Sequence, residues 1–306
     1  MTQDDSTILV VGATGTIGGA ALRALLSQGA RVRALVRSPA RMQGMKGVEI
    51  MAGDLADPDA VTRALQGIQV ALYVSPHEQS EEHLAETFIT QCEKQAVRLV
   101  FVGVHVDAPT RLGRAVRRLL FGRMAPSYKA KFRISERART SSTRPIVLMP
   151  TNFFDNDLIF SQELCRGQFI QPFNHPINRV AARDVGEAAA RACLDPSLPS
   201  GAYPVVGPVS LDGPACAAVW SEALGAHVRY LVDDALFRDA VMRSCSGKKV
   251  TDFLSSYQAI RNFKLPTSQS DLARTTALLG RAPTPYAEYV REVVAEWRAP
   301  LAARAS

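Results

Sequence analysis

Three glycines near the start of the chain have the spacing of an anion-binding loop. Gly12, Gly15 and Gly18 follow the apolar run Thr7 to Val11 and open a helical pattern. In that context the first glycine permits a tight turn, the second lets the backbone approach a pyrophosphate, and the third allows close packing of helix on strand. The free amides at the start of the helix then face the phosphates of a dinucleotide. The positions predicted to bind it are Gly12, Thr14, Gly15, Thr16, Ile17 and Gly18.

The end of the second apolar run is basic. From Ala30 to Gly47 the sequence has no carboxylate, whereas Arg37, Ser38 and Arg41 follow that run directly. Proteins that bind NAD usually carry Asp or Glu here to hold the ribose diol, but a guanidinium matches a 2′-phosphate in charge and geometry. The sequence therefore predicts NADP(H) in preference to NAD(H). The alternative is an ordinary solvated basic turn.

A third segment continues the same site. Asp54 and Leu55 follow the third apolar run, and Asp57 then caps a helix. Asp54 either accepts a hydrogen bond from the adenine amino group or only forms the turn.

These residues need a parallel sheet to hold them. The first half of the chain alternates β-branched apolar runs with helical patterns, which is typical of βαβ units and a doubly wound Rossmann-type α/β fold. The predicted strands are Thr7 to Val11, Arg31 to Val36, Val48 to Met51, Val70 to Val74, Arg98 to Val102 and Pro145 to Met149. The predicted helices are Ile17 to Gln28, Pro58 to Leu65, Glu81 to Gln95, Ala130 to Thr140 and a closing helix from Tyr286 to Trp297.

After Pro150 the alternation becomes irregular. We therefore predict a nucleotide-binding domain over residues 1–150 and a smaller substrate-side α/β region over residues 151–306. The two are expected to interleave, since residues 177–206 contain strand and helix patterns that return to the larger domain.

Composition narrows the class of protein. The 306 residues are 47% hydrophobic, which predicts a folded core, and the formal charge is +7. No nucleic-acid-binding motif accompanies that charge, and a basic balance also suits a cofactor that carries several phosphates. The five cysteines form no CxxC pair, and Asp4 and Asp5 stand where a signal peptide needs positive charge, so we expect a reduced, cytoplasmic protein. Neither cysteines nor histidines have metal-site spacing, so no metal is expected.

With these features in place, the chain resembles the NmrA-like group of atypical short-chain dehydrogenases/reductases up to about Gly207. Lys131 stands nineteen residues before Pro150, and the segment from Pro150 to Asn156 is similar to that group's Pro-Gly-x-Phe-x-x-Asn. The stretch from Asn178 to Glu187 resembles its strand-then-helix segment, which carries the Asp-Val pair. Members include quinone oxidoreductases, isoflavone-type reductases and proteins that sense the nicotinamide pool.

The resemblance implies where the nicotinamide half lies. The implied residues are Ser75, Pro76, Lys131, Pro150, Asn152 and Phe153. The sequence departs from the typical Tyr-x-x-x-Lys pair, because Ser127 stands at the tyrosine position and Tyr128 is one residue off, which predicts a side chain about 100° from the expected direction. The serine usual near the end of the fifth strand is also absent from the stretch Val102 to His105.

Three residues remain candidates for proton chemistry. Lys131 holds the ribose or relays a proton if it is desolvated, or else it is a solvated charge. His105 follows a strand end, where such sheets place ligands, and could polarise a carbonyl. Tyr128 could still donate if the helix is distorted, and His77 is an outside candidate.

Two further patterns bear on the substrate. In residues 111–123, arginines fill one helical face and apolar residues the other, which fits a mobile lid, a peripheral membrane contact or a solvated surface helix. Five phenylalanines between Phe153 and Phe173 would either line a site for a flat apolar substrate or pack in the core.

The sequence thus predicts an NADPH-dependent oxidoreductase. It would transfer hydride to a small, possibly lipophilic acceptor, aromatic or quinone-like, bound between the two regions. The competing hypothesis is a non-catalytic NADP(H)-sensing regulator that acts through protein partners. No nucleic acid is expected as a partner, and the oligomeric state is left open.

Overall fold

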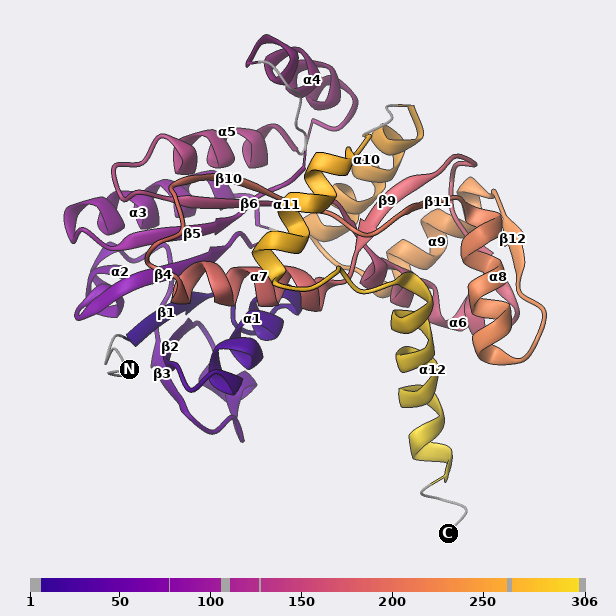
Figure 1. Cartoon of the computed structure of the whole chain (residues 1–306), viewed down its shortest axis with the longest axis horizontal. Coiled ribbons are helices and arrows are strands. Elements are labelled where there is room, and N and C mark those ends of the chain that lie inside the picture. Colours follow the sequence, from indigo (N-terminus) through magenta and orange to yellow (C-terminus); the bar gives the residue numbers. More distant parts are fainter. Residues whose placement is uncertain (1–6, 77, 106–110, 127, 263–265, 303–306) are drawn as a thin grey trace.

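A seven-stranded parallel sheet forms the centre of the molecule (Figure 1). The computed structural model describes residues 7–76, 78–105, 111–126, 128–262 and 266–302. The strands of this sheet, in spatial order, are β10 (Gly201–Val205), β6 (Ile146–Pro150), β5 (Arg98–Val102), β4 (Ile68–Val74), β1 (Thr7–Val11), β2 (Arg31–Val36) and β3 (Val48–Ala52). Every pairing is parallel, and the chain reverses direction across the sheet between β3 and β4. This confirms the doubly wound α/β fold.

Helices cover both faces of the sheet, which explains why its strands read as continuous apolar runs. On one face α1 (Thr16–Ser27) packs against α7 (Ala182–Leu194), and their side chains share a core with β1, β2 and β5. The other face carries α2 (Pro58–Leu65), α3 (Glu81–Lys94) and α5 (Tyr128–Arg139). The predicted helix Pro58 to Leu65 has those bounds, and the other predicted helices of the first half differ by one or two residues at an end.

Strand β10 lies well beyond residue 150 yet completes the large sheet beside β6. Its register pairs Gly201 with Ile146 and Val205 with Pro150. An edge strand tolerates Pro204, because one side of the strand needs no ladder hydrogen bond. Helix α11 (Gln269–Leu279) fastens β10 through Thr275, whose hydroxyl donates to the carbonyl of Pro204 and accepts from the amide of Val206.

The rest of the chain forms smaller layers beside this sheet. They comprise a three-stranded sheet of β11 (Ser210–Leu211), β9 (Ile177–Val180) and β7 (Asn152–Phe153), the pair β12 (Arg229–Leu231) and β8 (Gln168–Ile170), the 3-10 helices η1 (Pro39–Met42) and η2 (Phe154–Phe160), and helices α4 (Arg111–Met124), α6 (Ser161–Cys165), α8 (Gly213–Leu224), α9 (Asp234–Ser244), α10 (Lys248–Asn262) and α12 (Tyr286–Ala302).

A buried ion pair organises these smaller layers. Arg179 of β9 lies 2.5 Å from Asp157 of η2, and both are almost wholly buried. The Tyr286 hydroxyl donates to the other oxygen of Asp157, and the guanidinium lies 4.7 Å from the centre of the Tyr286 ring. Because a buried charge needs a partner and hydrogen bonds, this pair fixes how β9, η2 and α12 meet.

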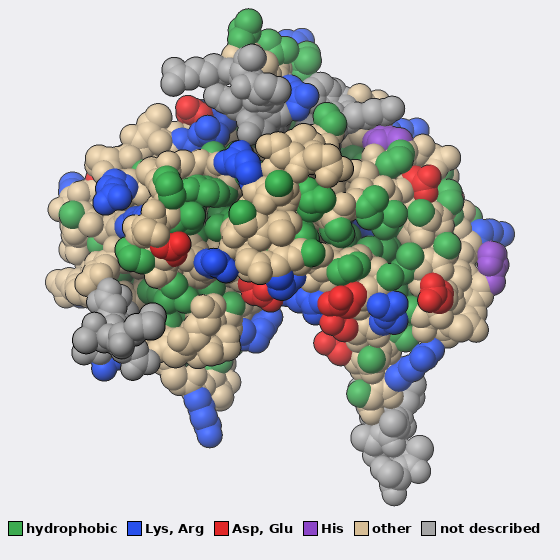
Figure 2. Space-filling model, viewed as in Figure 1, with side chains coloured by type: hydrophobic (Ala, Val, Ile, Leu, Met, Phe, Trp, Pro, Cys, Tyr) green, Lys and Arg blue, Asp and Glu red, His purple; other side chains and the backbone are tan. Residues whose placement is uncertain are grey.

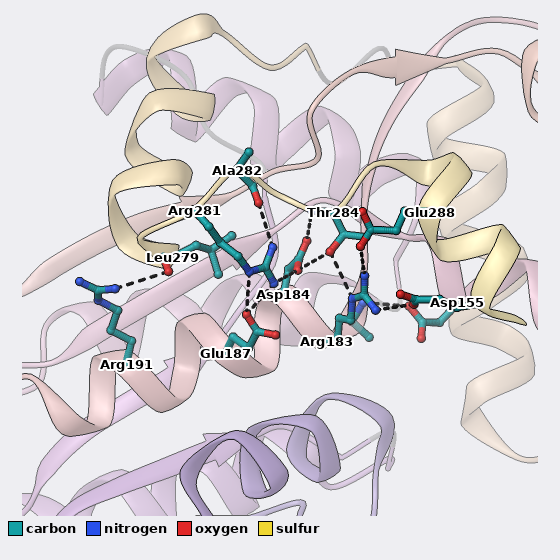
Figure 3. Close-up of polar contacts among 12 residues, drawn as sticks. Asp155, Arg183, Asp184, Glu187, Arg191, Leu279, Arg281, Ala282, Thr284 and Glu288 are labelled. Atoms are coloured by element: carbon teal, nitrogen blue, oxygen red, sulfur yellow. Dashed lines mark hydrogen bonds and ion pairs between the residues drawn. The ribbon is translucent and has the colours of Figure 1, made fainter. Parts of the chain in front are cut away.

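A second polar cluster ties α12 and the segment before it to α7. In Figure 2, acidic and basic side chains gather where α12 leaves the body of the molecule, and Figure 3 shows the contacts there. Asp184 is fully buried and accepts hydrogen bonds from the amide and hydroxyl of Thr284 and from Arg281. Arg281 also reaches the exposed Glu187. Asp184 belongs to the Asp-Val pair noted in the sequence, and here it anchors the chain that leads into α12.

We therefore expect Asp184→Ala to lower the free energy of unfolding by about 3 kcal/mol, because it leaves buried donors of Thr284 without an acceptor. Glu187→Ala is the matched control, since it removes an exposed partner of the same arginine and should cost less than about 1 kcal/mol. Urea unfolding monitored by circular dichroism measures both. Equal losses for the two variants would contradict the anchoring role of Asp184.

Candidate active site

A cavity of about 540 Å³ opens at the carboxyl ends of the central strands. Its wall is built from the residues that follow β4, β5 and β6, together with Ile17 from the glycine loop. Helix α10 forms the opposite wall with Asp252, Phe253, Ser256 and Ile260. Open α/β sheets bind ligands at this edge, next to the point where strand order reverses. The cavity thus brings sequence-distant candidates to one place.

The glycine loop has the close backbone contacts that its motif requires. Gly12 has a φ of +84°, and a Cβ there would lie 2.9 Å from the carbonyl oxygen of Val74. A Cβ at Gly18 would lie 2.1 Å from the carbonyl oxygen of Gly12, so only glycine allows α1 to start so near β1. Helix α1 has no side-chain cap and no acidic residue in its first turn.

These features fit a dinucleotide. Thr14, Gly15 and Thr16 are exposed at the start of α1, where uncapped amides and the helix dipole favour a phosphate. Ile17, one residue farther on, lines the cavity. The loop therefore has room for a pyrophosphate at a point from which the attached nicotinamide could reach the cavity.

The basic residues after β2 lie at the expected end of the sheet, and one of them is paired. Arg37, whose side chain is 64% exposed, lies 2.6 Å from Glu78 on the loop after β4. Ser38 and Arg41 are exposed beside it. An exposed ion pair contributes about 0.2–1 kcal/mol. A phosphate dianion could therefore displace Glu78 from Arg37 at little cost in free energy. Sequence reasoning missed Glu78, because nothing local links it to Arg37.

The residues after β3 and β4 are placed as follows. The Asp54 carboxylate accepts the amide of Ala56, which is a turn-forming contact, and the side chain is exposed at the strand end. Leu55 packs partly against the core beneath α2 and α3. Ser75 lines the cavity, and Pro76 is half-buried next to it. His77 lies outside the described residues.

Lys131 belongs to a buried group of four charges at the cavity wall. Its amine lies 2.9 Å from Glu81 and 4.0 Å from Asp252, and Lys248 lies 3.2 Å and 2.7 Å from the same two carboxylates. Burial alone would lower the pKa of Lys248, but the hydrogen bond to Asp252 and the charge of Glu81 raise it overall. Lys131 is therefore neither a solvated charge nor an isolated amine, because two carboxylates hold it.

Tyr128 lines the same cavity three residues before Lys131. Its ring packs against Phe121 and Phe132. Burial raises the pKa of Tyr128 to about 12, opposed by a hydrogen bond with Ser256 and supported by the carboxylates of Asp252 and Glu81. The phenol is thus protonated at neutral pH and able to donate. The sequence predicts a direction about 100° from that of the usual tyrosine, and in the structure Tyr128, three residues before Lys131, lines the cavity together with that lysine.

His105 and Ser135 complete the polar groups near the end of β5. His105 is 5% exposed, lines the cavity, and donates its backbone amide to the carbonyl of Pro150. Ser135 is buried on the cavity wall, and within the described part of the chain its hydroxyl makes no hydrogen bond. Its oxygen lies 2.9 Å from where a Cβ of Gly103 would stand. A hydroxyl from α5 therefore occupies the end of β5, where the expected serine is missing.

The segment after β6 also reaches the cavity. Pro150, Asn152 and Phe153 line it, and the Asn152 side chain is held by the amide of Asn156 and the hydroxyl of Tyr257. The other phenylalanines of the cluster, Phe154, Phe160, Phe169 and Phe173, are buried in the core.

Sequence reasoning missed the wall formed by α10. Asp252 and Ser256 line the cavity, and Lys248 pairs with Asp252 behind them. All three stand in a stretch without a motif, and their only signal is a four-residue spacing that places them on one helix face. Within the described ranges, no group of three or more metal-ligating side chains is suitably arranged, and no helix has the length and apolarity to cross a membrane.

Known proteins share this architecture. The model of the NmrA-like family matches residues 4–289. The NAD(P)H azoreductase of Xenophilus azovorans is 30% identical over 232 residues, which cover 73% of this chain and 76% of the azoreductase.

Two solved structures show the same fold at low identity. The NADPH-dependent quinone oxidoreductase of Escherichia coli, complexed with NADPH, has a TM-score of 0.76 and 22% identity over 94% of this chain and 99% of its own. NmrA, a negative transcriptional regulator in complex with NADP, has a TM-score of 0.72 and 18% identity over 95% of this chain and 96% of its own. With the family match over almost the whole chain, these findings establish that the protein belongs to the NmrA-like family.

Proposed function

We propose that this protein is an NADPH-dependent reductase that transfers hydride to a small aromatic or quinone-like acceptor in the cavity. The observation that carries the proposal is the cavity itself, where the glycine loop, the ends of β4 to β6 and α10 meet. The similarity to an NAD(P)H azoreductase over three quarters of both chains supports reductase chemistry. Bound reduced nicotinamide supplies the hydride.

The cavity wall suits a flat apolar acceptor with one polar end. Phe101, Phe121, Phe153 and Phe253 contribute aromatic surface, and Ile177 and Ile260 add aliphatic surface. Polar groups gather on one side, where Tyr128, Lys131 and Ser135 stand along α5. An acceptor oxygen or nitrogen on that side would lie near the protonated phenol of Tyr128. The two amines and two carboxylates around Lys131 balance in charge.

Two observations favour the regulator hypothesis. Ser127 stands at the usual tyrosine position and the usual serine is absent from the stretch Val102 to His105, and the fold is also that of a negative transcriptional regulator in complex with NADP. Single-turnover oxidation of NADPH with a panel of quinones, azo dyes and enones separates the two. Tight NADPH binding without oxidation by any of them would leave the sensor as the better account.

We expect Arg37→Asp to weaken NADPH binding by about 10- to 100-fold and to leave NADH binding nearly unchanged, because it removes the ligand of the 2′-phosphate. Glu78→Gln should tighten NADPH binding by up to about fivefold, because it frees Arg37 from its competing carboxylate. Dissociation constants from fluorescence titration with both cofactors test the pair.

The chain offers matched controls for both changes. Arg133 is 61% exposed and lies 2.6 Å from Glu82, a pair much like Arg37 and Glu78 but on the outer side of α5. Arg133→Asp and Glu82→Gln should leave the ratio of the two affinities unchanged. An Arg37→Asp variant with the parental ratio would remove the assignment of the phosphate site.

We expect Tyr128→Phe to lower kcat by about 100-fold and Ser135→Ala by about 10-fold, without weakening NADPH binding, because both remove a hydroxyl that faces the acceptor. Since the pKa of Tyr128 is about 12, the phenol stays protonated at neutral pH. Tyr128→Phe should therefore lower kcat by the same factor at each pH and leave the shape of the pH profile unchanged.

Tyr203→Phe is the control, because that hydroxyl donates to the carbonyl of Pro199 away from the cavity. Stopped-flow measurement of NADPH oxidation at several pH values reports each effect. Parental kcat in both Tyr128→Phe and Ser135→Ala would exclude these hydroxyls from the reaction.

A further inference from the structure

Helix α4 presents an apolar stripe to solvent. Leu112 and Leu119 are 75% and 65% exposed, and Val116 and Leu120 are 46% and 44% exposed. At 100° per residue these four side chains lie within one sector of about 100°. The helix projects beyond α5 at the edge of the molecule, where Figure 2 shows apolar and basic side chains together.

The inward side of α4 makes both an apolar and a charged contact. Phe121 is 2% exposed and lines the cavity, and Arg118 lies 2.6 Å from the exposed Glu136 of α5. A surface helix normally buries its apolar stripe and exposes its charges. Here a second apolar stripe stays outside, and exposed apolar surface of this kind is typical of a site that contacts a partner or a membrane.

The charge of this part of the chain indicates which kind of surface contacts the stripe. Residues 108–135 contain eight lysines and arginines and no aspartate or glutamate, and five of these arginines stand on α4. A second copy of the chain would bring the same arginine-rich helix against itself in a two-fold contact, which like charges oppose. A surface that is apolar inside and anionic at its rim is complementary both to the exposed stripe and to the positive charge of this segment.

We propose that α4 docks on an anionic lipid bilayer. Leu112, Val116 and Leu119 enter the boundary between headgroups and acyl chains, and the positive charge of residues 108–135 favours the anionic headgroups. One short helix gives weak and reversible attachment, so the protein exchanges between the bilayer and free solution.

Docking places the bilayer directly across α4 from the cavity, because Phe121 on the inner side of the helix is part of the cavity wall. A lipophilic acceptor could then pass from the acyl region to the cavity beneath α4. This consequence rests on the proposed function, whereas docking itself does not.

Co-sedimentation of the full chain with vesicles tests the proposal. Vesicles of mixed phosphatidylcholine and phosphatidylglycerol should bind the protein at least about tenfold more tightly than phosphatidylcholine alone. Raising NaCl from about 0.05 to about 0.5 M should remove most of that difference. The Leu112→Gln/Leu119→Gln variant should lose at least about tenfold in binding to the anionic vesicles.

The control is Val232→Gln/Met242→Gln, which removes two apolar side chains that are 51% and 57% exposed on another part of the surface. It should bind as the parent does, and both double variants should unfold at the parental temperature.

The proposal is overturned if the parent binds neither vesicle type or if the two double variants bind equally. It is also overturned if sedimentation velocity shows a dimer that only Leu112→Gln/Leu119→Gln dissociates, because α4 would then be a contact between copies. NADPH oxidation is assayed separately, so a failure of docking leaves the reductase proposal standing.

Discussion

The buried charges of Lys131, Glu81, Lys248 and Asp252 are the constraint on which the cavity depends. Two amines and two carboxylates balance in charge, and each amine lies within 4.0 Å of both carboxylates. Removing one member would leave an uncompensated buried charge, which costs several kcal/mol, so the group holds α10 against α3 and α5 in one arrangement. The same contacts set the distance between α10 and the strand ends, and therefore the width of the cavity.

Much of the large sheet could be predicted because its information is local. A strand covered on both faces is a continuous apolar run, and the helix between two such strands keeps a 3.6-residue period, so β1, β2 and β5 were predicted with their observed bounds. The second half depends on distant pairs instead. β8 pairs with β12, which lies some sixty residues later in the chain. Asp157, Arg179 and Tyr286 come from three separate elements and contact one another only in the folded protein. No residue spacing in the sequence predicts these long-range contacts.

The candidate site divides in the same way. The glycine loop, Arg37 and the segment from Pro150 to Phe153 are short motifs at strand ends, and the fold brings them to one edge of the sheet. Glu78 and the α10 wall belong to the site only through tertiary contacts, so they were not predicted. Tyr128 shows how a correct count can mislead. It stands one residue from the usual tyrosine position, which turns a helical side chain by about 100°, yet it is three residues from Lys131 and lines the same cavity.

This geometry bears on the choice between reductase and sensor. A sensor needs only the dinucleotide site, and nothing in that role requires an apolar cavity beyond the nicotinamide. This chain has an apolar cavity at the ends of its central strands with hydroxyls on its polar side, and Ser135 stands at the end of β5, where the usual serine is absent, and Tyr128 stands next to the usual tyrosine position. A buried hydroxyl without a protein partner carries a desolvation cost of about 1–3 kcal/mol, which a bound acceptor would relieve. The missing triad is therefore weaker evidence against catalysis than its sequence pattern suggests, because side chains from neighbouring positions supply the same chemical groups.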